Sequence, residues 1–140
     1  METRKIEASV AIVDDDPIYQ FTAKKILQLS NLSGEIQQYL TGDDALEFIK
    51  NNRAQIEKLP DILLLDLNMP VMDGWMFLES YNKLKDTVGK EIIIYLVTSS
   101  IDPRDIAQSK SYGIVKDFIS KPLDIEMVKE ILSSNQKIRH

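Results

Sequence analysis

Residues 11–17 read Ala-Ile-Val-Asp-Asp-Asp-Pro, and they place three carboxylates in a row where an apolar run ends. The third acid, Asp16, has a local explanation, because an Asp before Pro favours a helix N-cap with Pro at the first helical position. Asp14 and Asp15 have no such explanation, and two like charges about 4 Å apart repel by roughly 1 kcal/mol in water. The segment therefore predicts either solvated loop acids or a divalent-cation site, since hard ions such as Mg²⁺ prefer carboxylate oxygens.

The composition indicates one globular domain. A chain of 140 residues with 44% hydrophobic and 28% charged residues can bury one sizeable core. No apolar run is long enough to span a membrane, and neither a signal core nor a cysteine indicates export, so we expect a cytoplasmic protein with no membrane partner. The net charge of −5, without a basic cluster, argues against direct nucleic-acid binding.

Five short segments have the patterns of strands. Three are apolar runs, typical of strands buried on both faces, and two interleave apolar and polar residues, which fits the edges of the same sheet. The buried strands are expected at residues 8–13, 62–65 and 92–97, and the edges at 35–40 and 115–120.

Helical patterns separate these strands. Thr41 and the two residues after Gly42 predict a capped start for the second helix, and residues 103–112 predict a lightly anchored fourth helix, with Ile106 and Ala107 as its main core candidates. The predicted core stripes are Ile18, Phe21, Thr22, Ile26 and Leu29 in the first helix, Phe77, Tyr81 and Leu84 in the third, and Ile125, Val128, Ile131 and Leu132 in the last.

Strand and helix thus alternate five times, which predicts an α/β fold with a doubly wound, five-stranded parallel sheet and helices on both faces. The three buried strands in the centre and the two mixed ones at the edges match the flavodoxin-like order 2-1-3-4-5. Ligands of such sheets bind beyond the carboxyl ends of the strands.

Five polar side chains are expected at that rim: Asp14, Asp15, Asp66, Thr98 and Lys121. Taken singly, each has a structural explanation as a turn residue, a capping hydroxyl or a rim charge. Taken together they form a coherent set for phosphoryl transfer, in which acids hold Mg²⁺, one acid attacks phosphorus, and a hydroxyl and an ammonium receive oxygens of the transferred group.

Four motifs occur in order along the chain: IVDDDP at 12–17, LLLDLNMPVMDG at 63–74, VTSS at 97–100 and FISKP at 118–122. Their combination resembles the receiver domain of two-component response regulators, and the likeness extends from about Lys5 to Leu132. We therefore expect a single receiver domain over residues 1–140, with a short N-terminal extension and a loose tail from Ser133 to His140.

The resemblance implies that Asp66 accepts a phosphoryl group from a histidine kinase or a histidine phosphotransfer protein. It implies that Asp14 and Asp15 hold Mg²⁺, which Mn²⁺ could replace, together with Asp66 and the backbone carbonyl of Asn68. Such a domain is a regulatory phosphoacceptor, with self-catalysed phosphorylation and dephosphorylation, rather than an enzyme.

Further roles follow from the same resemblance. Thr98 is expected to bond a phosphoryl oxygen, Lys121 to pair with the phosphoryl group, and Phe118 to turn inward as the switch aromatic. A cis peptide is expected between Lys121 and Pro122.

The last predicted helix leaves little chain for an effector domain, so we expect a stand-alone receiver. Its output is then the binding of a downstream protein target, or transfer of the phosphoryl group to another protein. The expected readout surface is formed by the fourth helix, the fifth strand and the fifth helix.

Three alternatives fit less well. An aspartate-based phosphohydrolase of the haloacid dehalogenase type requires a second Asp where this chain has Asn68. A flavodoxin-like nucleotide binder requires a phosphate-binding loop after the first strand, where this chain has acids. A degenerate receiver that acts as an unphosphorylated scaffold would lack some of the five site residues, and all five are present.

Overall fold

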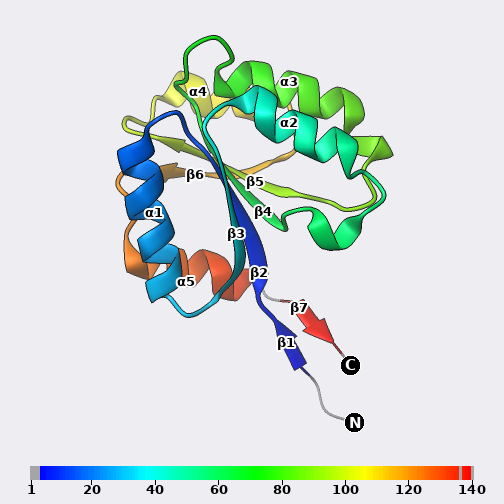
Figure 1. The fold of residues 1–140 in the computed structure, drawn as a ribbon. Helices are drawn as coiled ribbons and strands as arrows, with labels where there is room; N and C mark the ends of the chain where they lie inside the picture. The colour runs from blue at the N-terminus through cyan, green and yellow to red at the C-terminus, as the bar shows by residue number, and fades with distance from the viewer. Residues whose placement is uncertain (1–3, 136, 140) are drawn as a thin grey trace.

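The computed structural model of the chain describes residues 4–135 and 137–139. Its main sheet has five parallel strands in the spatial order β3-β2-β4-β5-β6 (Figure 1). They are β2 (Ala8–Val13), β3 (Ser33–Tyr39), β4 (Ile62–Asp66), β5 (Ile93–Thr98) and β6 (Val115–Ser120). Counted within this sheet the order is 2-1-3-4-5, which confirms the predicted doubly wound, flavodoxin-like fold.

Five α-helices connect or follow these strands. They are α1 (Pro17–Leu29), α2 (Gly42–Asn51), α3 (Gly74–Leu84), α4 (Pro103–Ser109) and α5 (Ile125–Ser134), with short 3-10 turns η1 (Ile56–Lys58) and η2 (Lys85–Thr87). The predicted caps are confirmed, because the side chains of Asp16 and Thr41 accept hydrogen bonds from backbone N–H groups in the first turns of α1 and α2.

The central strands carry the core on both faces of the sheet. Helices α2 and α3 cover one face, and α1 and α5 cover the other (Figure 1). Alternate residues of β4 divide between the two sides: Leu63 and Leu65 pack toward α3, whereas Ile62 and Leu64 pack toward α1 and α5. The sheet is thereby fixed on both faces, and its carboxyl edge is free to carry polar groups.

The core stripes predicted for α3 and α5 are largely confirmed. Phe77, Tyr81 and Leu84 of α3 are buried, as are Val128 and Leu132 of α5. The remaining two predicted residues of α5, Ile125 and Ile131, are half-buried.

The core stripe predicted for α1 is wrong. Ile18, Phe21 and Leu29 leave 76%, 63% and 67% of their surface exposed. Thr22 is also exposed, and Ile26 is half-buried. The helix packs instead through Gln20, Ala23 and Leu27, because Ala23 permits close approach to the sheet and Gln20 satisfies main-chain carbonyls there.

Helix α4 is shorter than predicted, and its predicted core residues are exposed. Ile106 is 37% exposed and Ala107 is exposed as well, so that Ser109 is the buried residue of this helix. The expectation of light anchoring is confirmed, although residues 110–112 form a turn rather than a continuation of the helix.

The two ends of the chain form an additional antiparallel ribbon. Strand β1 (Arg4–Ile6) pairs with β7 (Lys137–Arg139), and the ribbon extends away from the main sheet (Figure 1). The expectation of loose ends is therefore wrong for these two segments. His140, the last residue of the predicted tail, lies outside the described residues.

Candidate functional site

The acid pair after β2 has one buried and one exposed member. Asp14 is 1% exposed, its Oδ1 atom accepts a hydrogen bond from the backbone N–H of Asp16 at 2.9 Å, and its Oδ2 atom lies 2.7 Å from Nζ of Lys121. Asp15 is exposed. The pair thus offers one carboxylate fixed by the fold and one that can approach a ligand.

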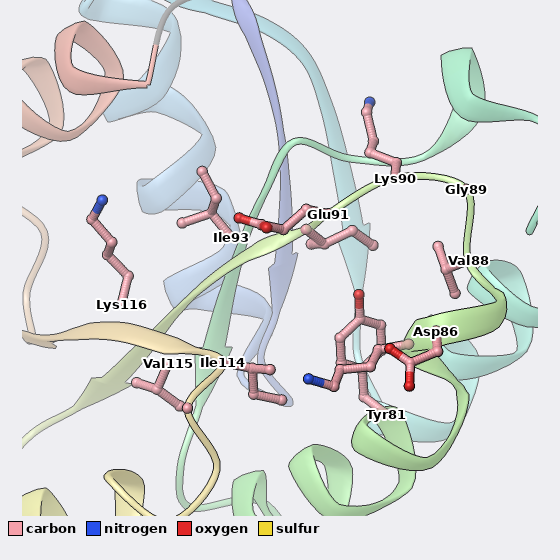
Figure 2. Close-up of a pocket in the computed structure, with 13 residues that line it drawn as sticks. Tyr81, Asp86, Val88, Gly89, Lys90, Glu91, Ile93, Ile114, Val115 and Lys116 are labelled. Carbon is pink, nitrogen blue, oxygen red and sulfur yellow. The ribbon is translucent and has the colours of Figure 1, made fainter.

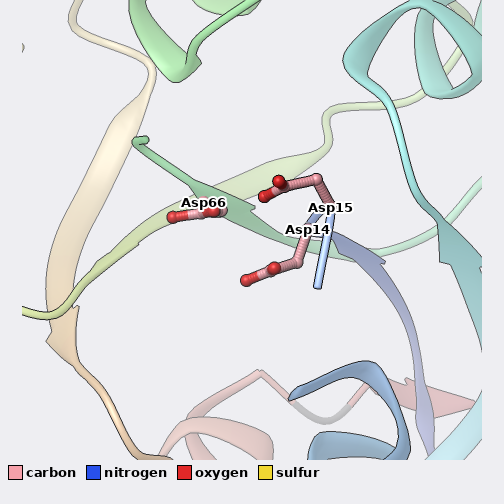
Figure 3. A group of neighbouring side chains, drawn as sticks. All are labelled: Asp14, Asp15 and Asp66. Atoms are coloured by element: carbon pink, nitrogen blue, oxygen red, sulfur yellow. The ribbon is translucent and has the colours of Figure 1, made fainter. Parts of the chain in front are cut away.

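Asp66 ends β4, the neighbour of β2 in the sheet, and its side chain is 5% exposed. Its Oδ1 atom accepts a hydrogen bond from the backbone N–H of Asn68 at 3.2 Å. One oxygen each from Asp14, Asp15 and Asp66 lies within 4.8 Å of the others, and Figure 3 shows the three side chains gathered at adjacent strand ends. The convergence predicted from the sequence is therefore present.

The loop after Asp66 is tied back to the sheet. The backbone N–H of Leu67 donates to the carbonyl of Val97, and the N–H of Gly74 donates to the carbonyl of Leu67, both at 3.0 Å. A Cβ atom at Gly74 would lie 2.9 Å from the Cα atom of Leu67, so this close approach requires glycine. These contacts fix the backbone next to the Asp66 carboxylate.

Lys121 is the cation of the site. Its backbone N–H donates to the carbonyl of Thr98, and its ammonium contacts both Asp14 and, at 3.5 Å, Oδ1 of Asp66. The peptide between Lys121 and Pro122 is cis, as the resemblance implied.

The shared negative charge shifts the pKa values of the site. Burial, followed by repulsion from Asp14, raises the pKa of Asp66 to about 6, although Lys121 and the N–H of Asn68 act in the opposite direction. Burial alone would lower the pKa of Lys121, but its contacts with Asp14 and Asp66 outweigh burial and raise it. The ammonium therefore stays charged while the carboxylates around it repel one another.

Thr98 and Phe118 belong to β5 and β6, the two strands that follow β4 in the sheet. Thr98 ends β5, and its buried hydroxyl exchanges hydrogen bonds with the backbone of Ser100 at 3.2 and 3.3 Å. Phe118, opposite Leu96 in the sheet register, is half-buried and packs against the core on the α3 side. Their switch roles stay predictions.

The response regulator receiver domain family matches residues 10–133 of the chain. The chain belongs to this family. It is accordingly a receiver domain of two-component signalling, and the carboxyl edge described above is the edge at which receiver chemistry is expected.

Individual relatives agree with this assignment. The response regulator MprA of Mycobacterium sp. (strain KMS) is 31% identical over 120 residues, which are 84% of this chain and 45% of that protein. A two component response regulator from Cytophaga hutchinsonii has a solved structure with a TM-score of 0.82 and 28% identity, covering 92% of this chain and 97% of that one. The Mn²⁺-bound form of response regulator Rcp1 shares the fold at a TM-score of 0.71 and 24% identity, over 90% of this chain and 92% of that one.

The chain spans about half, or less, of the length of the curated relatives it matches. No helix in the described part of the chain is long and apolar enough to cross a membrane.

The donor set of this receiver fits a divalent cation. All the grouped donor atoms are carboxylate oxygens, which suit hard ions such as Mg²⁺ or Mn²⁺. The three grouped acids and the Lys121 ammonium, which contacts two of them, carry a net charge of −2 when all are ionised. A dication matches that charge.

Two residues of α1 that support the site were missed in the sequence. The Nε2 atom of Gln20 lies within 3.1 Å of the carbonyls of Ile12, Asp14 and Tyr39, so this side chain joins the ends of β2 and β3 behind the acid pair. The ring of Tyr19 lies beneath the Lys121 ammonium. The sequence pattern does not predict either contact, because the more apolar stripe of α1 lies on the other side of the helix.

A pocket of about 720 Å³ lies at the other end of the sheet, near the amino ends of β5 and β6 (Figure 2). Its apolar side includes Tyr81, Val88 and Ile114, and lysines and acids alternate around it. It contains none of the predicted site residues.

Proposed function

We propose that this receiver accepts a phosphoryl group on Asp66 from a phosphohistidine of a histidine kinase or a histidine phosphotransfer protein. A carboxylate oxygen of Asp66 forms a bond to phosphorus as the phosphorus–nitrogen bond of the donor breaks, and the released imidazole nitrogen takes up a proton. The observation that carries the proposal is the meeting of Asp66, the acid pair and Lys121 at one rim.

The electrostatics suit this role. With a pKa of about 6, Asp66 is mostly ionised at pH 7 and is available as a nucleophile. Lys121, already 3.5 Å from the acceptor carboxylate, pairs with oxygens of the transferred phosphoryl group. Thr98 exchanges its bond to Ser100 for a bond to a phosphoryl oxygen.

The cation in this proposal is Mg²⁺, held by Asp14, Asp15, Asp66 and the backbone carbonyl of Asn68, and Mn²⁺ can substitute for it. When bound, it neutralises charge on the transferring group. The oxygen-only donor set and the Mn²⁺ reported for the similar receiver Rcp1 support this assignment.

Output follows from a shift between two conformations. Phosphorylation draws Thr98 toward Asp66 and Phe118 inward, and the lightly packed helix α4 responds, which changes the affinity for a downstream protein target. Amide chemical shifts of residues 103–112 should change on phosphorylation, and unchanged shifts there would exclude this route.

The acceptor is tested by intact mass after incubation with acetyl phosphate, with and without Mg²⁺. We expect one added phosphoryl group that requires Mg²⁺ and is absent from Asp66→Asn. Hydrolysis of the product in the same site is checked by sampling early time points, since a short-lived adduct would otherwise be missed.

Asp16→Asn is the matched control, because it removes the neighbouring acid of the same run while Asn still caps α1. It should be phosphorylated at the wild-type rate. No adduct on the wild type at any time would exclude the acceptor role and favour a receiver that acts as a scaffold.

A further inference from the structure

Tyr19, in the first turn of α1, makes an unusual contact with the site. Nζ of Lys121 lies 4.3 Å from the centroid of its ring, within the range of a cation–π interaction. The ring is half-buried and packs against the core on the α1 and α5 side. Its hydroxyl is buried and forms no hydrogen bond within the described part of the chain.

Within the described residues, three groups contact the Lys121 ammonium: the Asp14 carboxylate at 2.7 Å, the Asp66 carboxylate at 3.5 Å and the Tyr19 ring. Under the proposed function the two carboxylates change during the cycle. Asp14 shares its charge with a cation, and Asp66 loses its charge when it becomes an acyl phosphate. The aromatic ring is the one contact of the three that neither event alters.

We propose that Tyr19 is a positioning residue, whose ring keeps the Lys121 ammonium over Asp66 while the charges of the surrounding carboxylates change. This inference rests on the proposed function of Asp66. It assigns the residue a role beyond filling space, since a cation is attracted to the face of an aromatic ring and gains nothing comparable from an aliphatic side chain.

The unpartnered hydroxyl allows a sharp test. Because it has no partner within the described residues, Tyr19→Phe removes a buried polar group and keeps the ring, so it should fold and function like the wild type. Tyr19→Leu keeps an apolar side chain in the core and removes the ring. If Tyr19 were only structural, the phosphorylation rate of each variant would fall only as far as its stability falls.

The first measurement is the rate of phosphorylation by acetyl phosphate at saturating Mg²⁺. Tyr19→Leu should be slower by about three- to thirtyfold, the range that cation–π pairs cover from exposed to desolvated settings. Tyr19→Phe should restore the wild-type rate. Tyr95→Leu is the control, because Tyr95 lies in the same core and its loss should lower stability without lowering the rate.

The second measurement is independent of phosphorylation. In the Mg²⁺-free protein, the ring current of Tyr19 should displace the NMR resonances of the Lys121 side-chain methylenes. The displacement should persist in Tyr19→Phe and in Tyr95→Leu and disappear in Tyr19→Leu. The Lys121→Arg variant identifies these resonances by their loss.

The outcomes separate the two proposals. Displaced Lys121 resonances in a wild type that takes no phosphoryl group would overturn the proposed function and leave the contact in place. Equal rates in Tyr19→Leu and the wild type, or a slow Tyr19→Phe, would overturn the positioning role. Undisplaced Lys121 resonances in the wild type would overturn the contact itself.

Discussion

The two ends of the central sheet treat buried charge in opposite ways. At the amino end, Asp61 accepts hydrogen bonds from the backbone and hydroxyl of Ser9 and lies 2.8 Å from Nζ of Lys90, which also donates to the carbonyl of Leu59 at 2.9 Å. Asp61 and Lys90 form an ion pair there, and both side chains are 11% exposed.

At the carboxyl end, the ion pair between Lys121 and Asp14 is about as short, at 2.7 Å, but Asp66 lies 3.5 Å from the same ammonium and Asp15 adds a third carboxylate to the group. The local charges do not balance. The fold therefore pairs a buried acid with a base at the amino end of the sheet. The excess of carboxylates over ammonium groups at the carboxyl end is a feature of the receiver site.

The amino-end pair should give the largest effect on stability. Asp61→Asn leaves Lys90 without its charged partner, and removal of one member of a buried ion pair costs about 3 kcal/mol or more. Urea unfolding should show this loss, with phosphorylation of the folded protein unchanged. A loss below about 1 kcal/mol, as for a surface ion pair, would mean that the Asp61–Lys90 pair contributes little to stability.

At the carboxyl end, the free energy of unfolding should fall as the pH rises, because of Asp66. An Asp in the unfolded chain titrates near pH 3.9, whereas the pKa of Asp66 is about 6 in the fold. The folded state binds this proton more tightly, so the stability that it contributes is complete below pH 4 and is lost as the pH rises through 6.

Between pH 4 and pH 7 in metal-free buffer, we expect the titration of Asp66 to lower the free energy of unfolding by about 2 to 3 kcal/mol. The difference in unfolding free energy between wild type and Asp66→Asn isolates it, because the other carboxyls titrate in both proteins. A difference that is constant across this pH range would contradict the assigned shift.

Gln20 supports the carboxyl end of the sheet through uncharged hydrogen bonds. Gln20→Leu removes the amide donor shared by the carbonyls of Ile12, Asp14 and Tyr39, and should cost about 2 kcal/mol, since these carbonyls lose one hydrogen-bond donor. Faster hydrogen exchange at the N–H of Asp14, which bonds to Tyr39, should accompany the loss. Wild-type exchange there would mean that the strand ends are held by other contacts.

The smallest effect is expected on the exposed side of α1. Phe21→Ala should change the unfolding free energy by less than about 0.5 kcal/mol, because the ring is 63% exposed. Leu27→Ala, on the buried side, should cost about 2 to 5 kcal/mol. If Phe21→Ala and Leu27→Ala lowered stability equally in thermal unfolding, Phe21 would belong to the core, as the sequence predicts.

The sequence predicts the fold and the site best where an apolar strand is followed directly by a polar residue. The apolar runs in β2, β4 and β5 are typical of buried strands, and polar residues that directly follow parallel strands lie at one edge of the sheet. The sequence therefore predicts one edge for all five site residues: Asp14, Asp15, Asp66, Thr98 and Lys121.

The errors lie where the outcome depends on contacts across the fold. The periodicity of α1 identifies an apolar stripe, but Gln20 faces inward because three carbonyls from two strands meet it there. Tyr19 likewise gains its position from Lys121, which is more than a hundred residues away in the chain. No local pattern records either contact.

The central claim is that the charge imbalance at the carboxyl end serves a cation and the phosphoacceptor. It is tested most directly by the unfolding free energy of wild type and Asp66→Asn at pH 7, in EDTA and then in Mg²⁺. In EDTA, Asp66→Asn should be the more stable protein by roughly 2 kcal/mol, because a repelled carboxylate is gone. At Mg²⁺ about 100-fold above its dissociation constant, the wild type should gain about 2.7 kcal/mol and the gap should close. A wild type that is the more stable protein in EDTA, and that gains nothing from Mg²⁺, would contradict the account.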